Sequence, residues 1–499
     1  MIFPRGEEGG SEEAMPEAGI PYVAGDPWAI SAFALYFLVV ILIGLWTARF
    51  SSREQANFLL GGRRMKTLVV ALSAVVSGRS AWLLLAVSGV AFVRGVGAIS
   101  MVAGYTVVEL VMCLTVARRL RRETGAAGDI TIPDYLASRF RDRVHLLRGV
   151  ASLIIIVFLI TYVGAQIKAG GKALSAGFGM PEWFGALLTG LVILAYTALG
   201  GFLAVSLTDV LQAFLMIFAL TGLPLLAMAN FGGPTAVVAA LDPAMFDPLA
   251  FGLGAIVGAL GIGLGSPGNP HILVRFMSIE DEKKLVPAGW IGFFWNVVMG
   301  IGAVGIGVVG RAFYTLEQLP GADRETIFPT LAGQLPPFLF GLVIAAVFAA
   351  IMSTADSQLL VAASAAVRDL YQRTFKGGTG ISERRMVALN RAAVVALCAA
   401  ALLIGLFAER YVNFLVLLAW TGLGCSFGPP IILGLYWKRC NRWGALAGML
   451  AGAAVTFIWG LNPQLKAIIH EIIPAFAASA LATFVISLFT HSFCKTNEN

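Results

Sequence analysis

Charged side chains are scarce in this sequence. Only 13% of its 499 residues are Asp, Glu, Lys or Arg, whereas soluble domains carry about 25%. Hydrophobic residues make up 58%, and the mean hydropathy is +0.84. A surface with so little charge does not keep a protein dissolved in water, so the composition excludes an ordinary soluble enzyme.

Cysteine and histidine are also few, with 5 and 4 residues. The cysteines stand far apart without a CxxC pair, which is typical of apolar packing residues rather than of disulfides or metal ligands. Within the apolar stretches no histidine stands beside a serine, an arrangement that a hydrolytic site in the membrane would need. We therefore expect neither enzymatic activity nor a transition-metal site.

Long apolar runs are what the sequence has instead. A helix needs about 20 apolar residues to cross a bilayer, and thirteen stretches come near that length. These stretches are 29–48, 67–92, 97–117, 149–171, 183–200, 205–228, 250–272, 287–310, 336–366, 387–407, 412–436, 443–461 and 471–490. The sequence thus predicts an all-α polytopic membrane protein, with a single transmembrane domain at 29–492, an acidic tail at 1–28 and a short tail at 493–499.

Basic residues are distributed unevenly between these stretches. Most of the 35 lysines and arginines fall in alternate connections, for example at 118–122 and 384–385. Because basic connections stay on the cytoplasmic side of a membrane, the N-terminal tail is expected outside and the C-terminal tail in the cytoplasm. The acidic tail is unlike a secretory signal, which begins with basic residues. The net charge of +7 is then a result of topology and does not indicate a nucleic-acid partner.

Two of the apolar stretches, 67–92 and 250–272, contain residues that interrupt a helix. Residues 261–270 hold four glycines and two prolines, and relative to alanine these cost a helix about 1 and 3 kcal/mol each. Residues 73–82 are rich in serine and glycine. Each break opens a block of five stretches, about 67–228 and 250–436, which predicts an inverted repeat with a binding site near the membrane midplane. The alternative is a kinked but continuous helix.

Ionisable residues at membrane depth are costly and therefore mark candidate functional positions. They are Arg79, Glu109, Asp209, Asp356 and Arg391. On a helix Ser353, Asp356 and Ser357 share one face and gather oxygen atoms suited to an alkali cation. Alternatively, the hydroxyls bond to their own helix and Asp356 pairs with Arg79 or another helix. The alternative interpretation of Asp209 is an interfacial residue, and that of Arg391 is a residue whose side chain reaches the cytoplasm.

Four short motifs in the expected order resemble those of the sodium/solute symporter family. They are Asn57–Arg63 (NFLLGGR), Gly200–Asp209 (GGFLAVSLTD), Pro270–Leu273 (PHIL) and Met352–Thr354 (MST). The resemblance covers about residues 29–492 and is greatest to the sodium/proline symporter branch. It implies about thirteen helices, a LeuT-like five-plus-five core with a discontinuous first helix in each repeat, and sodium-driven import of a small solute across a bacterial inner membrane.

The resemblance also implies binding residues by position. Sodium, the coupling ion, would be held by carbonyls of Val76, Arg79 and Ala350 with the hydroxyls of Ser353 and Thr354. A second sodium site, present in some members, would use Asp209, Ser353, Asp356 and Ser357. The solute would contact Ser80, Trp82 and Tyr162, with Ile262 and Ser266 on the other broken helix. No metal other than sodium is expected.

This chain departs from the proline branch at both breaks. Residues 77–82 read Ser-Gly-Arg-Ser-Ala-Trp where that branch typically reads Ser-Asp-Met-Ser-Gly-Trp, so an acid is missing and Arg79 is added. Ile262 and Ser266 stand where the branch has Trp and Tyr. The leading hypothesis is a sodium symporter of proline or a related amino acid. The alternatives are a sodium-independent exchanger or uniporter, a symporter of another small carboxylate or a polyol, and a nutrient sensor.

Overall fold

The computed structural model describes residues 25–51, 55–249, 252–376, 381–408 and 411–496. Most of the predicted acidic tail lies outside these ranges, as do the last three residues. The described residues contain helices and no strands. The long helices are α1 (Pro27–Ser51), α3 (Thr67–Ala81), α5 (Ile99–Leu114), α8 (Leu146–Phe178), α9 (Glu182–Asn230), α13 (Leu285–Phe313), α15 (Pro337–Ser364), α16 (Glu383–Phe407), α17 (Val412–Tyr436), α18 (Arg442–Gly460) and α20 (Ile472–Thr496).

Shorter helices connect or interrupt the long ones. They are α2 (Gln55–Leu60), α4 (Ser88–Arg94), α6 (Val116–Ala127), α7 (Ile132–Arg139), α10 (Pro234–Ala240), α11 (Leu253–Gly261), α12 (Pro270–Ser278), α14 (Ile327–Ala332) and α19 (Pro463–Ile468). Three irregular helical segments matter for the site. These are η3 (Trp82–Val87) and η10 (Ala365–Phe375), which are π-helical, and the 3₁₀ segment η6 (Ile262–Gly268).

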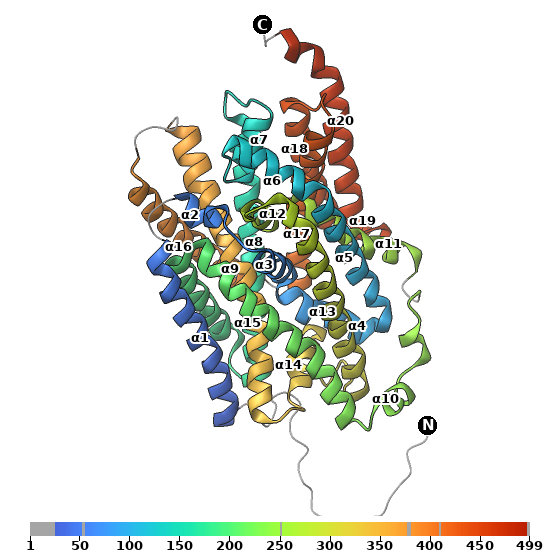
Figure 1. Cartoon of the computed structure of the whole chain (residues 1–499). Helices are drawn as coiled ribbons and strands as arrows, with labels where there is room; N and C mark the ends of the chain where they lie inside the picture. The colour runs from blue at the N-terminus through green and yellow to red at the C-terminus, as the bar shows by residue number, and fades with distance from the viewer. Residues whose placement is uncertain (1–24, 52–54, 250–251, 377–380, 409–410, 497–499) are drawn as a thin grey trace, which may run out of the picture.

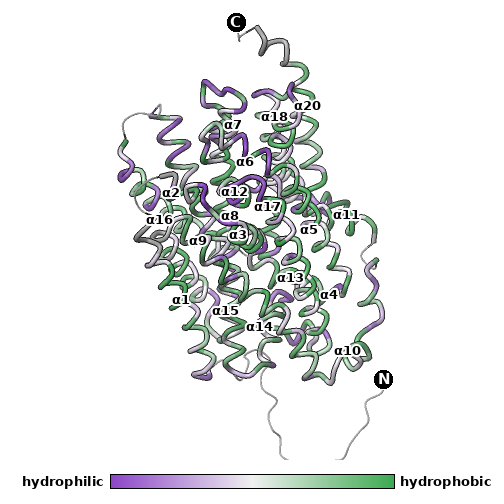
Figure 2. The backbone as a smooth tube through the Cα atoms, viewed as in Figure 1, coloured by the Kyte–Doolittle hydropathy of each residue, from purple (hydrophilic) through white to green (hydrophobic). Residues whose placement is uncertain are grey.

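Ten helices in the described ranges are long and apolar enough to cross a membrane. One continuous apolar region, 67–114, covers two of the predicted spans, and two shorter apolar helices, 182–195 and 253–268, match two more. Figure 2 shows hydrophobic colour along the long helices, with hydrophilic colour gathered at the end of the bundle that carries α6 and α7. The predicted multi-pass membrane architecture is confirmed, while the total of thirteen crossings stays a prediction.

The helices form a tilted bundle with α15 and α17 inside it (Figure 1). In the most apolar window of α17 94% of the residues are buried, against 28% for α1 at the edge of the bundle. A helix that is apolar all round and buried all round belongs to a core, whereas α1, α16 and α20 expose one side to lipid. The inner helices therefore hold the polar side chains that lie at membrane depth.

Glycines permit a close contact in this core, between α17 and η6. A Cβ atom on Gly424 would lie 2.3 Å from the Cα atom of Gly265, and one on Gly265 would lie 2.0 Å from the Trp420 Nε1 atom. Real Cβ contacts do not become this short, so neither position accepts a larger residue without backbone movement. Small residues at such crossings let two helix backbones approach in the membrane.

We predict that Gly424→Ala lowers the stability of the protein by about 1–3 kcal/mol, because overpacking forces the backbone apart. Gly222→Ala in α9 is a matched control, since nothing lies within 4 Å of its added Cβ atom. Thermal unfolding of both purified variants, followed by tryptophan fluorescence, checks the prediction. Equal melting temperatures for the two variants would contradict it.

Candidate functional site

The first predicted break is present in α3. Ser80 has φ +50° and ψ −174°, outside the helical region, and the chain continues as the π-helical segment η3. The amide groups that the break releases are bonded by side chains. The Ala81 amide donates to Gln166 Oε1 at 3.1 Å, and the Trp82 amide donates to Ser80 Oγ at 3.1 Å. Irregular backbone at membrane depth is thus buried in protein and kept hydrogen-bonded, as its location requires.

The second predicted break separates α11 from α12. The helix tightens to 3₁₀ geometry over η6, Asn269 is extended with φ −84° and ψ 109°, and α12 begins at Pro270. The Asn269 side-chain amide donates to the Gly265 carbonyl at 2.8 Å and lies 3.3 Å from the Trp420 carbonyl. The alternative of a continuous helix is therefore wrong at both positions.

The residues predicted to hold sodium come together where α3 faces α15. Thr354 Oγ1 lies 3.1 Å from the Ser77 carbonyl oxygen, and Ser353 Oγ lies 3.3 Å from that of Val76 and 3.1 Å from that of Ala350. The Ser77 hydroxyl donates back to the Ser353 carbonyl at 2.7 Å. All these residues are buried. The group offers only oxygen atoms, the ligands that hard cations prefer.

The Arg79 side chain turns away from this oxygen group. It forms an ion pair with Glu109 on α5, and its Nε atom donates to Asn296 Oδ1 on α13 at 2.9 Å. Its guanidinium group also lies over the Tyr105 ring, 3.7 Å from the centroid. The alternative pairing of Arg79 with Asp356 is wrong, because α15 packs against the opposite side of α3. The role of the Arg79 carbonyl as a ligand stays a prediction.

The residues predicted for a second sodium site also gather, but an arginine lies among them. Asp209 Oδ2 accepts hydrogen bonds from Ser73 Oγ at 2.5 Å and from Arg275 Nη2 at 3.1 Å. Arg275 Nη2 also donates to the Ser357 hydroxyl. Asp356 Oδ1 accepts from the Ser357 amide at 2.5 Å. The interfacial interpretation of Asp209 is wrong, since its side chain is 0% exposed.

Arg275 is the functional candidate that sequence reasoning missed. Counting basic residues in connections places it at the cytoplasmic end, yet it lies in α12 with its side chain 1% exposed. Pro270 offers the one signal that could have found it. A proline favours the first position of a helix, so a new helix is expected to begin at Pro270, directly after the break. Arg275 then lies less than two turns from the break, close to the broken segments.

The predicted solute residues form two groups on the two breaks. On the α3 side the Ser80 and Tyr162 hydroxyls are 3.4 Å apart, and Trp82 Nε1 donates to Asn413 Oδ1 at 2.8 Å. Gln166 and Asn413 are polar residues of this group that the sequence did not single out. They lie in α8 and α17, far from the break along the chain, so no local pattern marks them.

On the other break, Ile262 and Ser266 both lie in η6 and are buried. The Ile262 carbonyl accepts from Trp420 Nε1 at 2.8 Å, and the Ser266 hydroxyl donates to Glu109 Oε1 at 3.2 Å. An aromatic side chain is therefore present near η6, but α17 supplies it. Whether these residues contact a solute stays a prediction.

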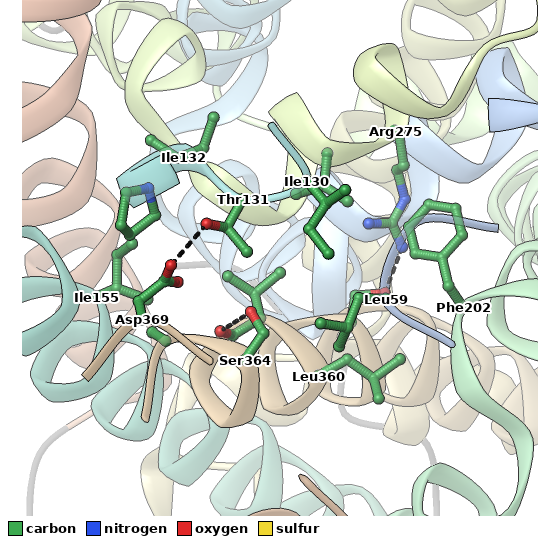
Figure 3. Close-up of a pocket in the computed structure, with 15 residues that line it drawn as sticks. Leu59, Ile130, Thr131, Ile132, Ile155, Phe202, Arg275, Leu360, Ser364 and Asp369 are labelled. Carbon is green, nitrogen blue, oxygen red and sulfur yellow. Dashed lines mark hydrogen bonds between the residues drawn. The ribbon is translucent and has the colours of Figure 1, made fainter. Parts of the chain in front are cut away.

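Two cavities lie on either side of the breaks. A cleft of about 300 Å³ is bounded by α4, α11, α17 and residues 466–470, and it reaches Ile262 and Asn413. Figure 3 shows the other cavity, with Arg275 and Asp369 at its opposite ends. Its volume is about 20 Å³, which is room for about one water molecule.

Polar contacts close the far side of the small cavity. Thr131 Oγ1 donates to Asp369 Oδ1 at 3.0 Å, joining the start of α7 to η10. Asp134 in α7 forms ion pairs with Arg148 at 3.2 Å and Arg368 at 2.9 Å. The path on this side of the site is therefore shut, whereas the cleft on the other side is wide.

Comparisons with known proteins agree with this geometry. The model of the sodium:solute symporter family matches residues 58–452. The chain is 38% identical to the osmoregulated proline transporter OpuE of Bacillus subtilis over 475 residues, which covers 94% of this chain and 96% of that protein. It is 39% identical to the high-affinity proline transporter PutP of the same organism, covering 91% and 96%. A sodium/proline symporter of Staphylococcus aureus is 35% identical, covering 93% and 94%.

Solved structures show the same fold. The chain superposes on the outward-open, substrate-bound state of a Na⁺-coupled sialic acid symporter with a TM-score of 0.79 at 18% identity, covering 93% of this chain and 97% of that one. The nucleobase-cation symporter Mhp1 gives a TM-score of 0.56 at 12% identity, covering 89% and 95%. With both breaks in place, the predicted LeuT-like fold is confirmed.

Proposed function

Because this chain belongs to the sodium:solute symporter family, we propose that it imports proline, or a closely related amino acid, together with sodium by alternating access across a bacterial inner membrane. The observation that carries the proposal is the buried oxygen group between the end of α3 and α15, formed by Val76, Ala350, Ser353 and Thr354. The protein works as a transporter, without catalytic chemistry of its own and without a nucleic-acid partner.

Sodium is the ion that this group suits. Carbonyl oxygens near the break of a helix keep unshared electron pairs that a cation accepts, and the two hydroxyl oxygens add to them without a buried charge. A bound ion would join α3 to α15 through its ligands. Because the solute residue Ser80 lies at the end of α3 and Trp82 follows directly on it, holding this helix in place also orders the solute site.

Arg275 bears on how many sodium ions are used. Its guanidinium group contacts Asp209 and Ser357, two of the residues expected at a second sodium site. A fixed positive charge there takes the position that a second cation would need. We therefore assign one sodium ion to each solute. The guanidinium group of Arg275 takes the place of the second sodium ion, beside Asp209 and Ser357.

The energy of one sodium ion is sufficient for a neutral solute. One charge moving through 100 mV supplies about 2.3 kcal/mol, and a tenfold concentration gradient adds about 1.4 kcal/mol. Together these support accumulation of a few hundredfold. A zwitterionic amino acid adds no net charge to this balance.

The α3 break provides groups suited to an amino acid. The Ala81 and Trp82 amides, held by Gln166 and the Ser80 hydroxyl, can pass to a solute carboxylate that displaces these acceptors. The rings of Trp82 and Tyr162 suit a small apolar body. The names of the relatives specify proline, while Ile262 and Ser266 make this chain's η6 wall less aromatic than that of the branch it resembles.

The orientation follows from the basic connections. The end with α6 and α7 is cytoplasmic in this proposal, so the cleft of about 300 Å³ opens outward and the cavity of about 20 Å³ faces the cytoplasm. The N-terminal tail is then outside and the C-terminus in the cytoplasm. With this orientation, the wide cleft and the small cavity support an outward-facing state that is closed toward the cell.

Uptake of radiolabelled proline into proteoliposomes tests the function. We expect the initial rate with an inward sodium gradient to exceed the rate with choline or potassium at least tenfold, because a bound ion would hold α3 against α15 and so keep the solute site in place. Equal rates in all three salts would exclude sodium coupling. If proline is not taken up, a thermal-shift panel of amino acids, carboxylates and polyols, with and without sodium, identifies the solute and leaves the coupling claim open to the same uptake test.

A further inference from the structure

A buried charge cluster lies on the side of α3 that faces away from the sodium group. We call Arg79, Tyr105, Glu109, Ser266 and Asn296 the Glu109 cluster. The side chains of Arg79 and Glu109 are 1% and 12% exposed, and the other three residues are buried. An ionised pair at this depth is costly unless hydrogen bonds satisfy both partners. The arrangement of these bonds therefore shows what holds the pair in place.

The Glu109 carboxylate is the centre of the cluster. Its Oε1 atom accepts from Arg79 and from the Ser266 hydroxyl, the latter at 3.2 Å, and its Oε2 atom accepts from Asn296 Nδ2 at 2.9 Å. Asn296 Oδ1 in turn accepts from Arg79 Nε at 2.9 Å, which closes a ring of three side chains. One carboxylate thus contacts both broken segments, α3 through Arg79 and η6 through Ser266.

Three positions where the sequence departs from the branch it resembles lie against this carboxylate. Arg79 and Ser266 bond to it directly. Gly78 is the third, because a Cβ atom on Gly78 would lie 3.6 Å from Glu109 Oε1. A carboxylate attached to α3 at position 78 would therefore fall in the region that the Glu109 carboxylate fills.

We infer that Glu109, placed beside the break by α5, neutralises Arg79 and so keeps the sodium group free of an adjacent uncompensated positive charge. This inference rests on the proposed function. Arg79 stands only three residues after Val76, whose carbonyl belongs to the sodium group, so its charge acts on the ion at short range. Glu109 is a positioning residue, since it acts on sodium through Arg79 and touches neither ion nor solute.

Equilibrium binding of ²²Na⁺ to the purified full-length protein tests the inference without any solute. We expect Glu109→Gln to weaken sodium binding at least tenfold, because Arg79 then keeps an unbalanced charge. The double variant R79M/E109Q removes both charges and is expected to bind within about threefold of the wild type. A residue that only supported the fold would make the double variant no better than E109Q, and that result would overturn the inference.

Moving the carboxylate gives a sharper test. The variant E109Q/G78D places the acid on α3, beside Arg79. The new Cβ atom would lie 3.1 Å from the Ile272 Cδ1 atom, which is the flexible end of a side chain and can move. We expect sodium affinity within threefold of the wild type. If E109Q alone fails to fold, the E109Q/G78D variant provides the test. A loss of more than tenfold in its sodium affinity would overturn the inference.

The control and the wild type separate this inference from the proposed function. Glu471 is another buried carboxylate, directly before α20, and it pairs with Lys466 of α19. The variant Glu471→Gln should keep sodium affinity within twofold of the wild type. If the wild type itself binds no ²²Na⁺, the proposed sodium coupling fails. If the wild type binds and E109Q binds equally well, the proposed function stands and the inference about Glu109 is wrong.

Discussion

Replacing Ser353 and Thr354 together with alanine is expected to raise the sodium concentration needed for half-maximal uptake by at least about 100-fold. The two hydroxyls are two of the five predicted sodium ligands, and hydrogen-bond-like contacts to a charged group contribute about 1.5–3 kcal/mol each. The combined loss of about 3–6 kcal/mol corresponds to more than two decades in affinity. Initial uptake rates in proteoliposomes over a wide range of sodium concentrations measure the effect.

The matched control is another buried pair of hydroxyl residues, on α20 at the place where this helix packs against Gly448 of α18. In α20 the Thr483 hydroxyl bonds to the Ser479 carbonyl at 2.8 Å, within its own helix. The variant S479A/T483A should keep the sodium dependence of the wild type. An unchanged sodium dependence in S353A/T354A would place the coupling ion elsewhere and remove the observation on which the proposed function depends.

Arg275→Met is expected to lower stability by about 3–5 kcal/mol, the usual cost of removing one partner from a buried ion pair. The Arg275 and Asp209 side chains are 1% and 0% exposed, so no water can compensate the carboxylate that remains. The double variant D209N/R275M removes that uncompensated charge and should regain more than half of the loss. Thermal unfolding of the purified proteins, in sodium-free buffer, compares the three.

An exposed ion pair provides the reference for this second prediction. Lys66 and Glu280 are 2.8 Å apart, but the Lys66 side chain is 72% exposed. Surface pairs of this kind contribute at most about 1 kcal/mol, so Lys66→Met should hardly change the melting temperature. If R275M were as stable as K66M, Arg275 would not be the fixed cation of the second position.

Local composition was enough to locate both broken helices. A helix is interrupted locally by the glycines and prolines between 261 and 270, and by the serine and glycine residues before Trp82. Because these residues act on their own backbone, their effect can be predicted from the sequence. The sodium group followed from short motifs matched by position. Both kinds of information concern one segment at a time. The structure confirms the breaks at Ser80 and Asn269 and brings Ser353 next to the Val76 carbonyl, while the role of Ser353 in binding sodium stays a prediction.

The partners of the buried charges could not be predicted in this way. Arg79 pairs with Glu109 and bonds to Asn296, which is 217 residues away in the sequence. Arg275 meets Asp209 across 66 residues. Such pairs depend on how the helices pack, and several acids lay at comparable membrane depth in the sequence. A count of basic residues also assumes that every arginine near a helix end is exposed. Arg275 in α12 is buried, so the assumption fails there.

If the side of the bundle with α6 and α7 is the cytoplasmic one, as proposed, its closure has a consequence for the energy supply of a cell that makes this protein. A hydrated ion cannot pass a space that holds about one water molecule, so the resting carrier does not let the ion gradient leak away. To release its cargo, α7 has to separate from η10, which means that the Thr131–Asp369 and Asp134–Arg368 contacts break in every cycle and form again. Stronger contacts between α7 and η10 would keep ions from leaking through the carrier, but they would also slow each transport cycle.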